Sequence, residues 1–135
     1  MIPYQTKSNK ISGTSYGEVM KKAFLSFDEI KKKTKRRPYI RSAYFKKEKV
    51  FLDYFREHLF QKSQKERMNR LRFFNASLEL IRDSKIGPVE KSESFERKEI
   101  LYRFAGLTKE KSLFYVQVKE DKKKRKYMMS CFSPK

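Results

Sequence analysis

A carboxylate, several cations and an aromatic ring recur at alternate positions in the last third of the chain. Side chains alternate between the two faces of a β-strand, so residues of the same parity share a face. If the strands take a compatible register, one exposed face carries the following set: Glu99, Arg103, Tyr115, Gln117, Lys119, Lys126 and Ser130. The other parity gives Phe114, Val116 and Val118, which we expect to be buried against a helix.

This set suits cleavage of RNA without a metal. Attack of a ribose 2′-hydroxyl on the adjacent phosphate needs a base, an acid and cations that stabilise the extra charge of the transition state. Glu99 is the predicted base, and Tyr115 is predicted to stack a nucleobase. The predicted phosphate clamps are Arg103, Lys119 and Lys126, with Gln117 and Ser130 beside them. An ordinary solvated antiparallel sheet shows similar residues, so a plain exposed face stays open.

Other kinds of site find less support. One histidine and one cysteine exclude a zinc cluster built from the chain's own His and Cys, and we predict neither metal nor cofactor. Residues 120–122 match the Glu-x-Lys half of a magnesium nuclease motif, but a charged turn produces the same triplet. The single histidine, His58, is a candidate for acid–base chemistry, although a lone histidine on a helix is more often a surface or cap residue. Cys131 occupies a position suited to a small apolar residue on a strand.

The charge of the chain indicates an anionic partner. Its 35 Lys and Arg residues against 16 Asp and Glu give a formal net charge of +19, which is self-repulsive in a compact protein. With 12 Phe and 8 Tyr, the chain is too aromatic for a disordered basic tail. Basic runs at 31–37, 46–49 and 122–126 and an arginine-rich helix predict contacts with RNA, whether tRNA or mRNA. The predicted binding residues are Lys35, Arg36, Arg37, Arg67, Arg70, Tyr115, Arg125 and Tyr127.

The sequence predicts that the helices come first in the chain and that the sheet comes last. Residues 1–13 form a predicted loose arm, and 14–135 a single domain. Apolar spacing predicts a helix over 14–30, and a capping box at Ser63 and Glu66 begins a second one that reaches Ile81. Residues 39–45 and 50–54 favour a hairpin slightly over a helix through Leu59. A loop over 88–97 and strands over 99–104, 113–119 and 125–132 complete the prediction. The fold class is therefore α+β, with N-terminal helices packed on a C-terminal antiparallel β-sheet of three to four strands.

The setting predicted for the chain is the cytoplasm. A single cysteine rules out an intrachain disulfide and fits a reducing compartment. The first residues lack a basic-then-apolar signal pattern, and no apolar run approaches membrane length, so we expect no membrane partner. A toxin delivered into another cell would give the same pattern.

Several short motifs resemble one nuclease group. In chain order they are Val50–Tyr54, Glu57-His58-Leu59, Leu78–Arg82, Gly87-Pro88, and strands containing Leu101–Phe104, Phe114–Glu120 and Lys126–Phe132. Over residues 50–132 this order resembles the small toxin and phage-associated nucleases grouped with barnase, colicin-type tRNA nucleases and the RelE toxins.

The resemblance implies a helix-then-antiparallel-sheet fold and metal-independent endoribonuclease activity on the open face of the sheet. It favours Arg103, Gln117, Lys119 and Ser130 as active residues. The chain departs from barnase in having no histidine near residue 132, which puts a histidine general acid in doubt. RelE-type toxins use Arg, Lys and Tyr instead, a role open to Arg125, Lys126 and Tyr127.

The sequence therefore predicts a metal-independent endoribonuclease that is toxin-like or associated with a mobile element. Two alternatives remain open. One is a non-catalytic nucleic-acid-binding module that uses the same face. The other is a basic protein that docks an acidic antitoxin or adaptor.

Overall fold

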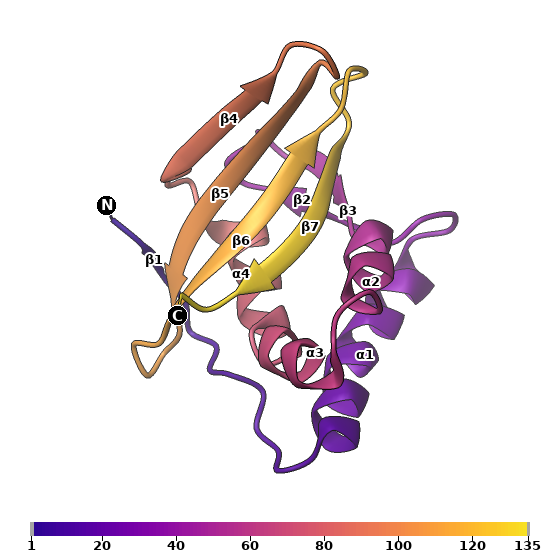
Figure 1. Ribbon diagram of the computed structural model, residues 1–135, viewed down its shortest axis with the longest axis vertical. Coiled ribbons are helices and arrows are strands. Elements are labelled where there is room, and N and C mark those ends of the chain that lie inside the picture. Colours follow the sequence, from indigo (N-terminus) through magenta and orange to yellow (C-terminus); the bar gives the residue numbers. More distant parts are fainter. Residues whose placement is uncertain (1, 135) are drawn as a thin grey trace.

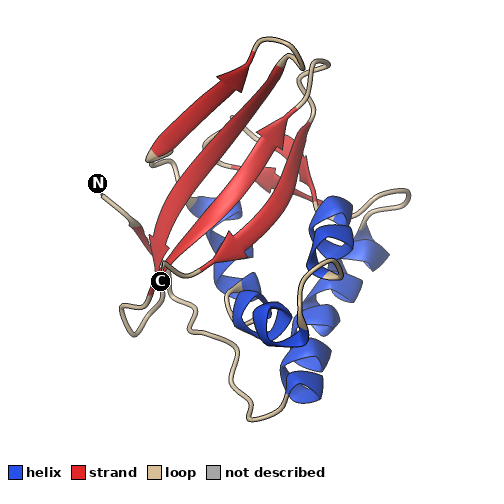
Figure 2. Cartoon of the chain, in the orientation of Figure 1, coloured by secondary structure: helices blue, strands red, loops and turns tan. Residues whose placement is uncertain are grey.

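Four helices and seven strands follow one another in the computed structural model, which describes residues 2–134 (Figures 1 and 2). The elements are β1 (Tyr4–Gln5), α1 (Tyr16–Lys33), β2 (Tyr39–Ser42), β3 (Glu48–Phe51), α2 (Asp53–Leu59), α3 (Gln64–Leu71), α4 (Phe74–Asp83), β4 (Glu90–Ser94), β5 (Glu99–Leu107), β6 (Leu113–Glu120) and β7 (Lys126–Phe132). The fold is α+β. None of the helices in this part of the chain is long and apolar enough to cross a membrane.

The strands form one mixed sheet, curled into a half-barrel (Figure 1). Their order is β1-β5-β6-β7-β3-β2, and β4 pairs with β5 beside β1. The β3–β7 and β1–β5 pairs are parallel, whereas the others are antiparallel. The predicted sheet of three to four antiparallel strands was therefore wrong in both strand number and direction.

Local sequence patterns did not predict the additional strands, and each has its own physical reason. β4 lies within the predicted loop, and all five of its residues are polar because it is an edge strand with exposed or half-exposed side chains. β1 has only two residues. The hairpin of β2 and β3 was predicted, but its parallel pairing with β7 joins segments far apart in the chain, which local patterns do not encode. The alternative helical interpretation holds for the residues after this hairpin, where α2 begins at Asp53.

The helix predicted from Ser63 to Ile81 is two helices. Its start is confirmed, because the Ser63 hydroxyl accepts a hydrogen bond from the Glu66 N–H at 3.3 Å. The helix ends at Leu71, where the Arg72 carbonyl accepts the Ile11 N–H at 2.8 Å. The Arg72 guanidinium donates in turn to the Ile11 carbonyl at 3.0 Å. The N-terminal segment thus crosses the chain at the break between α3 and α4.

The same segment, predicted as an arm ahead of the domain, is attached at several points. The N–H of Thr6 donates to the Leu107 carbonyl, which extends the pairing of β1. Glu79 on α4 is buried, and its carboxylate accepts the N–H groups of Lys7 and Ser8 at 2.8 and 3.1 Å. The first part of the chain therefore covers one end of α4.

The hydrophobic core fills the hollow of the half-barrel. Phe114, Val116 and Val118 are buried, as their parity predicts. Stacked aromatic rings bind the layers together, with ring centroids 5.5 Å apart for Phe73 and Phe114. α4 packs on the side of the sheet that carries Phe114, whereas α2 and α3 lie beside β7 and leave most of the other face of β5 and β6 open to solvent (Figure 1).

Candidate nucleic-acid interface

The open face arranges its side chains in rows across the strands. Arg103, Gln117 and Ser130 lie opposite one another on β5, β6 and β7. Tyr115 and Phe132 form the neighbouring row on one side. On the other side, one row runs through five strands, from β5 to β2: Leu101, Lys119, Tyr127, Phe51 and Tyr39. Five of the seven residues predicted to share this face as a set lie in these rows.

Lys126 does not lie in these rows, because β7 contains a β-bulge. Met128 is opposite Val118 and Ser130 is opposite Gln117, so Met129 is an extra residue between them. A strand with this extra residue reverses its alternation, and Lys126 and Ser130 point to opposite faces. Lys126 is buried on the core side, hydrogen-bonded to Glu48. Its predicted place among the phosphate clamps was therefore wrong.

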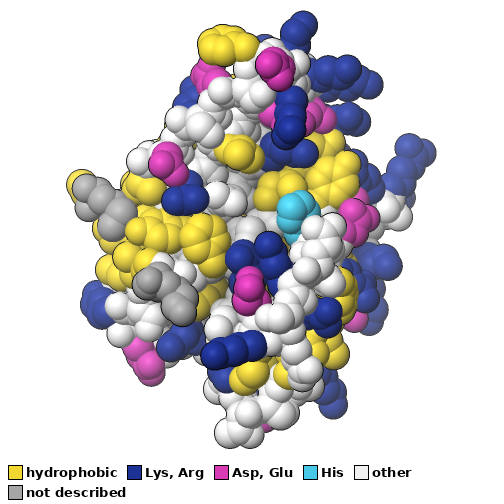
Figure 3. All heavy atoms as spheres, in the orientation of Figure 1, with side chains coloured by type: hydrophobic (Ala, Val, Ile, Leu, Met, Phe, Trp, Pro, Cys, Tyr) yellow, Lys and Arg dark blue, Asp and Glu magenta, His cyan; other side chains and the backbone are white. Residues whose placement is uncertain are grey.

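A pocket of about 310 Å³ lies between the open face and the α2–α3 segment. Its walls come from three strands and two helices: Phe55, His58, Leu59, Lys62, Arg70, Arg103, Gln117, Met129, Ser130 and Phe132. Below, this is called the central pocket. Figure 3 shows the histidine beside lysine and arginine side chains near the middle of this face.

Two arginines meet at one aromatic ring in the central pocket. The Cζ atoms of Arg70 and Arg103 lie 5.5 and 5.3 Å from the centroid of the Phe132 ring. Arg70 also donates a hydrogen bond to the Ser130 hydroxyl. Arg103 pairs with the exposed carboxylate of Glu90 at 3.2 Å, and its buried Nε–H has no partner among residues 2–134. An unpaired buried donor is uncommon in folded proteins and is often found at functional sites. The pocket therefore concentrates guanidinium groups whose hydrogen-bonding capacity is only partly used.

The predicted base lies away from the central pocket. Glu99 is on the same face as Arg103, but four residues along β5 separate them by about 13 Å. Its carboxylate instead pairs with Lys119 at 3.8 Å. Lys119 lies one row from the pocket, and its Nζ is 5.7 Å from the Tyr54 ring centroid.

Tyr127 and Arg125, the other predicted binding residues of β7 and its turn, are tied to Asp121. Tyr127 is buried, stacked on Tyr54 with centroids 4.6 Å apart, and its hydroxyl donates to Asp121 at 3.1 Å. Tyr127 is therefore not free to stack a base. Burial alone would raise the pKa of Asp121, but hydrogen bonds from the Arg125 backbone and the Tyr127 hydroxyl hold it below its usual value. Arg125 is exposed and pairs with the same carboxylate at 3.1 Å.

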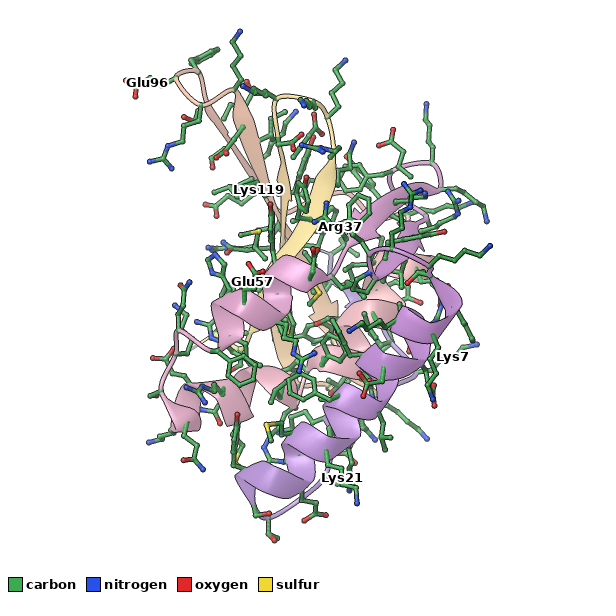
Figure 4. The ribbon with its side chains drawn as sticks, turned by 90° about the vertical axis from the view of Figure 1, so that its right-hand side faces the viewer. Lys7, Lys21, Arg37, Glu57, Glu96 and Lys119 are labelled. Atoms are coloured by element: carbon green, nitrogen blue, oxygen red, sulfur yellow. The ribbon has the colours of Figure 1, made fainter. Side chains whose placement is uncertain are left out.

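The remaining predicted cations divide between structural and accessible positions. Arg67 donates to the carbonyls of Lys62 and Phe60, and so fixes the turn after α2. Arg37 makes two 2.9 Å hydrogen bonds to Asp53. Lys35 and Arg36 are exposed near the β2–β3 hairpin. Figure 4 shows Arg37 and Lys119 on the same side of the molecule, above α2.

Six pocket residues were absent from the predicted site, and three of them, His58, Lys62 and Phe132, bear on its chemistry. His58 carried a signal as the only imidazole of the chain, but its place on a helix gave no reason to join it to the sheet. Lys62 is one lysine among many, and Phe132 was assigned only to a strand. The packing of α2 and α3 beside β7 brings His58 and Lys62 to Phe132, a tertiary arrangement that sequence spacing does not specify.

The chemistry that this arrangement allows is recognition of a phosphodiester. Two guanidinium groups and an ammonium group complement a phosphate, and Gln117 and Ser130 add neutral hydrogen-bonding groups. Within residues 2–134, no group of three or more His, Cys, Asp or Glu side chains is placed to hold a metal ion. No protein-family model, curated protein or solved structure matches this chain. The likeness to the barnase and RelE group therefore stays a prediction.

Proposed function

We propose that the protein is a metal-independent endoribonuclease with the central pocket as its phosphodiester site. One observation carries the proposal: Arg70 and Arg103 converge on Phe132 in an open pocket that also contains an imidazole. The net charge of +19 supports a polyanionic substrate. Aromatic rings beside the cations favour unpaired RNA, whose bases are free to stack.

In the proposed reaction, Arg70 and Arg103 bind the phosphate oxygens and stabilise the added negative charge of the transition state. His58 accepts the proton of the 2′-hydroxyl, in the role first predicted for Glu99. Histidine suits this role because its ordinary pKa of about 6.5 lies near neutral pH. The 2′-oxygen forms a bond to phosphorus while the bond from phosphorus to the 5′-oxygen breaks. The departing 5′-oxygen takes a proton from water, and the hydroxide that this leaves takes the proton from His58, which restores the base.

The test is incubation of total RNA with the purified protein in EDTA. We expect cleavage by the wild type and a loss of about 100-fold or more in Arg103→Ala, the scale found when one transition-state donor is removed. His58→Gln should lose a similar factor, since general base catalysis contributes about 10²–10⁴. The matched control is Arg82→Ala, because Arg82 is an exposed arginine on α4, paired with Asp83 and away from the central pocket. It should retain the wild-type rate.

Wild-type cleavage rates in Arg103→Ala, with its melting temperature unchanged, would overturn the assigned site. A second candidate function is a non-catalytic RNA-binding module, favoured by the rings of Tyr115 and Phe132 beside Arg103. That function predicts binding that weakens steeply with salt and yields no product. A protein that docks an acidic antitoxin or adaptor would instead show negligible RNA affinity at physiological salt.

A further inference from the structure

A second basic pocket lies at the β2–β3 end of the open face. Its volume is about 550 Å³, and it is lined by Lys33, Thr34, Lys35, Arg36, Arg37, Tyr39, Lys49 and Phe51. We call it the hairpin pocket. None of these lining residues is acidic, and within residues 2–134 only Arg37 among its cations has an ion-pair partner. The hairpin pocket is thus a separate concentration of positive charge with little internal compensation.

The floor of the hairpin pocket is aromatic. The rings of Tyr39 and Phe51 meet edge to face, with centroids 6.1 Å apart. The Lys49 ammonium lies 4.6 Å from the Tyr39 centroid, and the Arg37 Cζ lies 4.5 Å from the Phe51 centroid. Cations around partly exposed aromatic rings can bind a single-stranded nucleic acid, which offers both phosphates and unstacked bases. A duplex offers the phosphates only, because its bases are stacked inside.

The two pockets lie along the same side of the sheet, and between them the Tyr54 ring of α2 covers Tyr127. Tyr39 and Phe51 end the row that passes through Tyr127 to Lys119. Lys119 is next to Gln117, which lines the central pocket, on the same face of β6. Neighbouring strands are about 4.8 Å apart, so the three spacings from β6 to β2 amount to about 14 Å. An extended strand rises about 6 Å per nucleotide, nearly twice the roughly 3.4 Å of a stacked strand, so this separation corresponds to about two to three nucleotides.

We infer that the hairpin pocket anchors single-stranded RNA about two to three nucleotides away from the phosphate bound in the central pocket. This inference rests on the proposed function for the identity of the ligand as RNA. It adds a length requirement, because only a strand that reaches both pockets gains the second set of contacts. The anchor acts on affinity and on KM, whereas the central pocket sets the rate of the chemical step.

The experiment measures binding of 2′-O-methyl RNA, which lacks the attacking hydroxyl and is not cleaved by the proposed reaction. Fluorescently labelled single strands of 2 and 12 nucleotides are titrated in EDTA at several salt concentrations, because a dinucleotide is too short to reach both pockets. The test variant is Lys35→Ala/Arg36→Ala, and the matched control is Lys21→Ala/Lys85→Ala, which removes two exposed cations that line neither pocket, one on α1 and one after α4. Tyr39→Leu tests the aromatic floor.

We expect the test variant to bind the 12-mer about tenfold more weakly and the dinucleotide as the wild type does. The slope of log K against log salt should fall by about 1.4 for two lost phosphate contacts on a single strand. Tyr39→Leu should weaken 12-mer binding by at least about fivefold, since one stacked base contributes that much or more. The control should match the wild type with both strands.

Equal losses for both lengths, or equal losses in test and control variants, would overturn the inference. So would unchanged RNA affinity in the test variant, a result that would assign the hairpin pocket to another partner, such as an acidic protein. The proposed nuclease activity is judged separately with unmodified RNA. Length-dependent binding without cleavage would support the anchor and reject the nuclease, whereas cleavage without length dependence would do the reverse.

Discussion

Replacing Lys126 with methionine tests whether this lysine has a structural or a catalytic role. The Lys126 side chain is 7% exposed, and its Nζ contacts Glu48, the Glu120 carboxylate at 3.5 Å and the Lys124 carbonyl at 3.2 Å. Methionine keeps most of the apolar stem and removes the charge. We expect the variant to be less stable than the wild type and to retain its activity toward RNA, because Lys126 points away from the open face.

The expected loss of stability follows from the two carboxylates left behind. Removing one partner of a fully buried ion pair costs about 3–5 kcal/mol. Here Glu48 is 55% exposed and regains water. Glu120, with 14% of its side chain exposed, keeps the Tyr102 hydroxyl at 3.0 Å. Burial and this hydrogen bond raise the pKa of Tyr102 to about 12, so the phenol stays a donor at neutral pH. We therefore expect a loss of about 2–3 kcal/mol in the free energy of unfolding.

Thermal unfolding measures this loss. With an unfolding entropy of about 2.1 cal/mol/K per residue, the 135 residues convert it to a fall in Tm of about 7–11 °C. The Lys126→Met/Glu120→Gln double variant should recover part of the fall, because the remaining partner is neutral. Lys123→Met, at an exposed lysine in the adjoining turn, should leave Tm unchanged. An unchanged Tm together with lost RNA cleavage in Lys126→Met would refute the placement of the bulge.

Gly106→Ala should lower the free energy of unfolding by about 1–2 kcal/mol in chemical denaturation, because the new Cβ would lie 2.6 Å from the Phe114 ring and 2.8 Å from Leu80. Gly17→Ala is its control, since a Cβ there meets nothing within 4 Å, and a stability below the wild type would contradict this reasoning. Cys131 should resist a thiol reagent at pH 8, because complete burial raises the pKa of its thiol to about 12. Between its ordinary pKa and 12 the unfolded chain releases this proton and the folded one does not, so stability should fall as pH rises through that range. Rapid labelling of the folded protein would show that the thiol is accessible.

Local patterns were enough for the parts of the fold that bury a repeating face. Alternation in 113–119 identified the buried and open sides of β6, and the Ser63 cap located the start of α3. The break after Leu71 lies within an unbroken apolar stripe, so it depends on contacts with Ile11 that come from the other end of the domain. β4 shows no apolar alternation because an edge strand here buries almost nothing.

The sequence predicted which face most site residues occupy, but it did not predict the β-bulge or the packing of the helices beside the sheet. Arg103, Gln117 and Ser130 were assigned to one face, and their register brings them into one row. Lys126 was misplaced because strict alternation cannot reveal that Met129 is an additional residue. Arg70 was expected to contact nucleic acid from a helix, but its approach to Ser130 depends on how α3 packs beside β7. His58 joins the site for the same reason.

The two halves of the sheet meet at a short junction. β3 and β7 are paired at only two positions, Val50 with Lys126 and Phe51 with Tyr127, whereas β5 and β6 are paired along their whole length. Parallel pairs are also slightly less stable per residue than antiparallel ones. The position of the β2–β3 hairpin against the β4–β7 meander therefore depends more on side-chain packing than on main-chain pairing. The contacts of α4 with β2 and the hydrogen bond between Lys126 and Glu48 supply that packing.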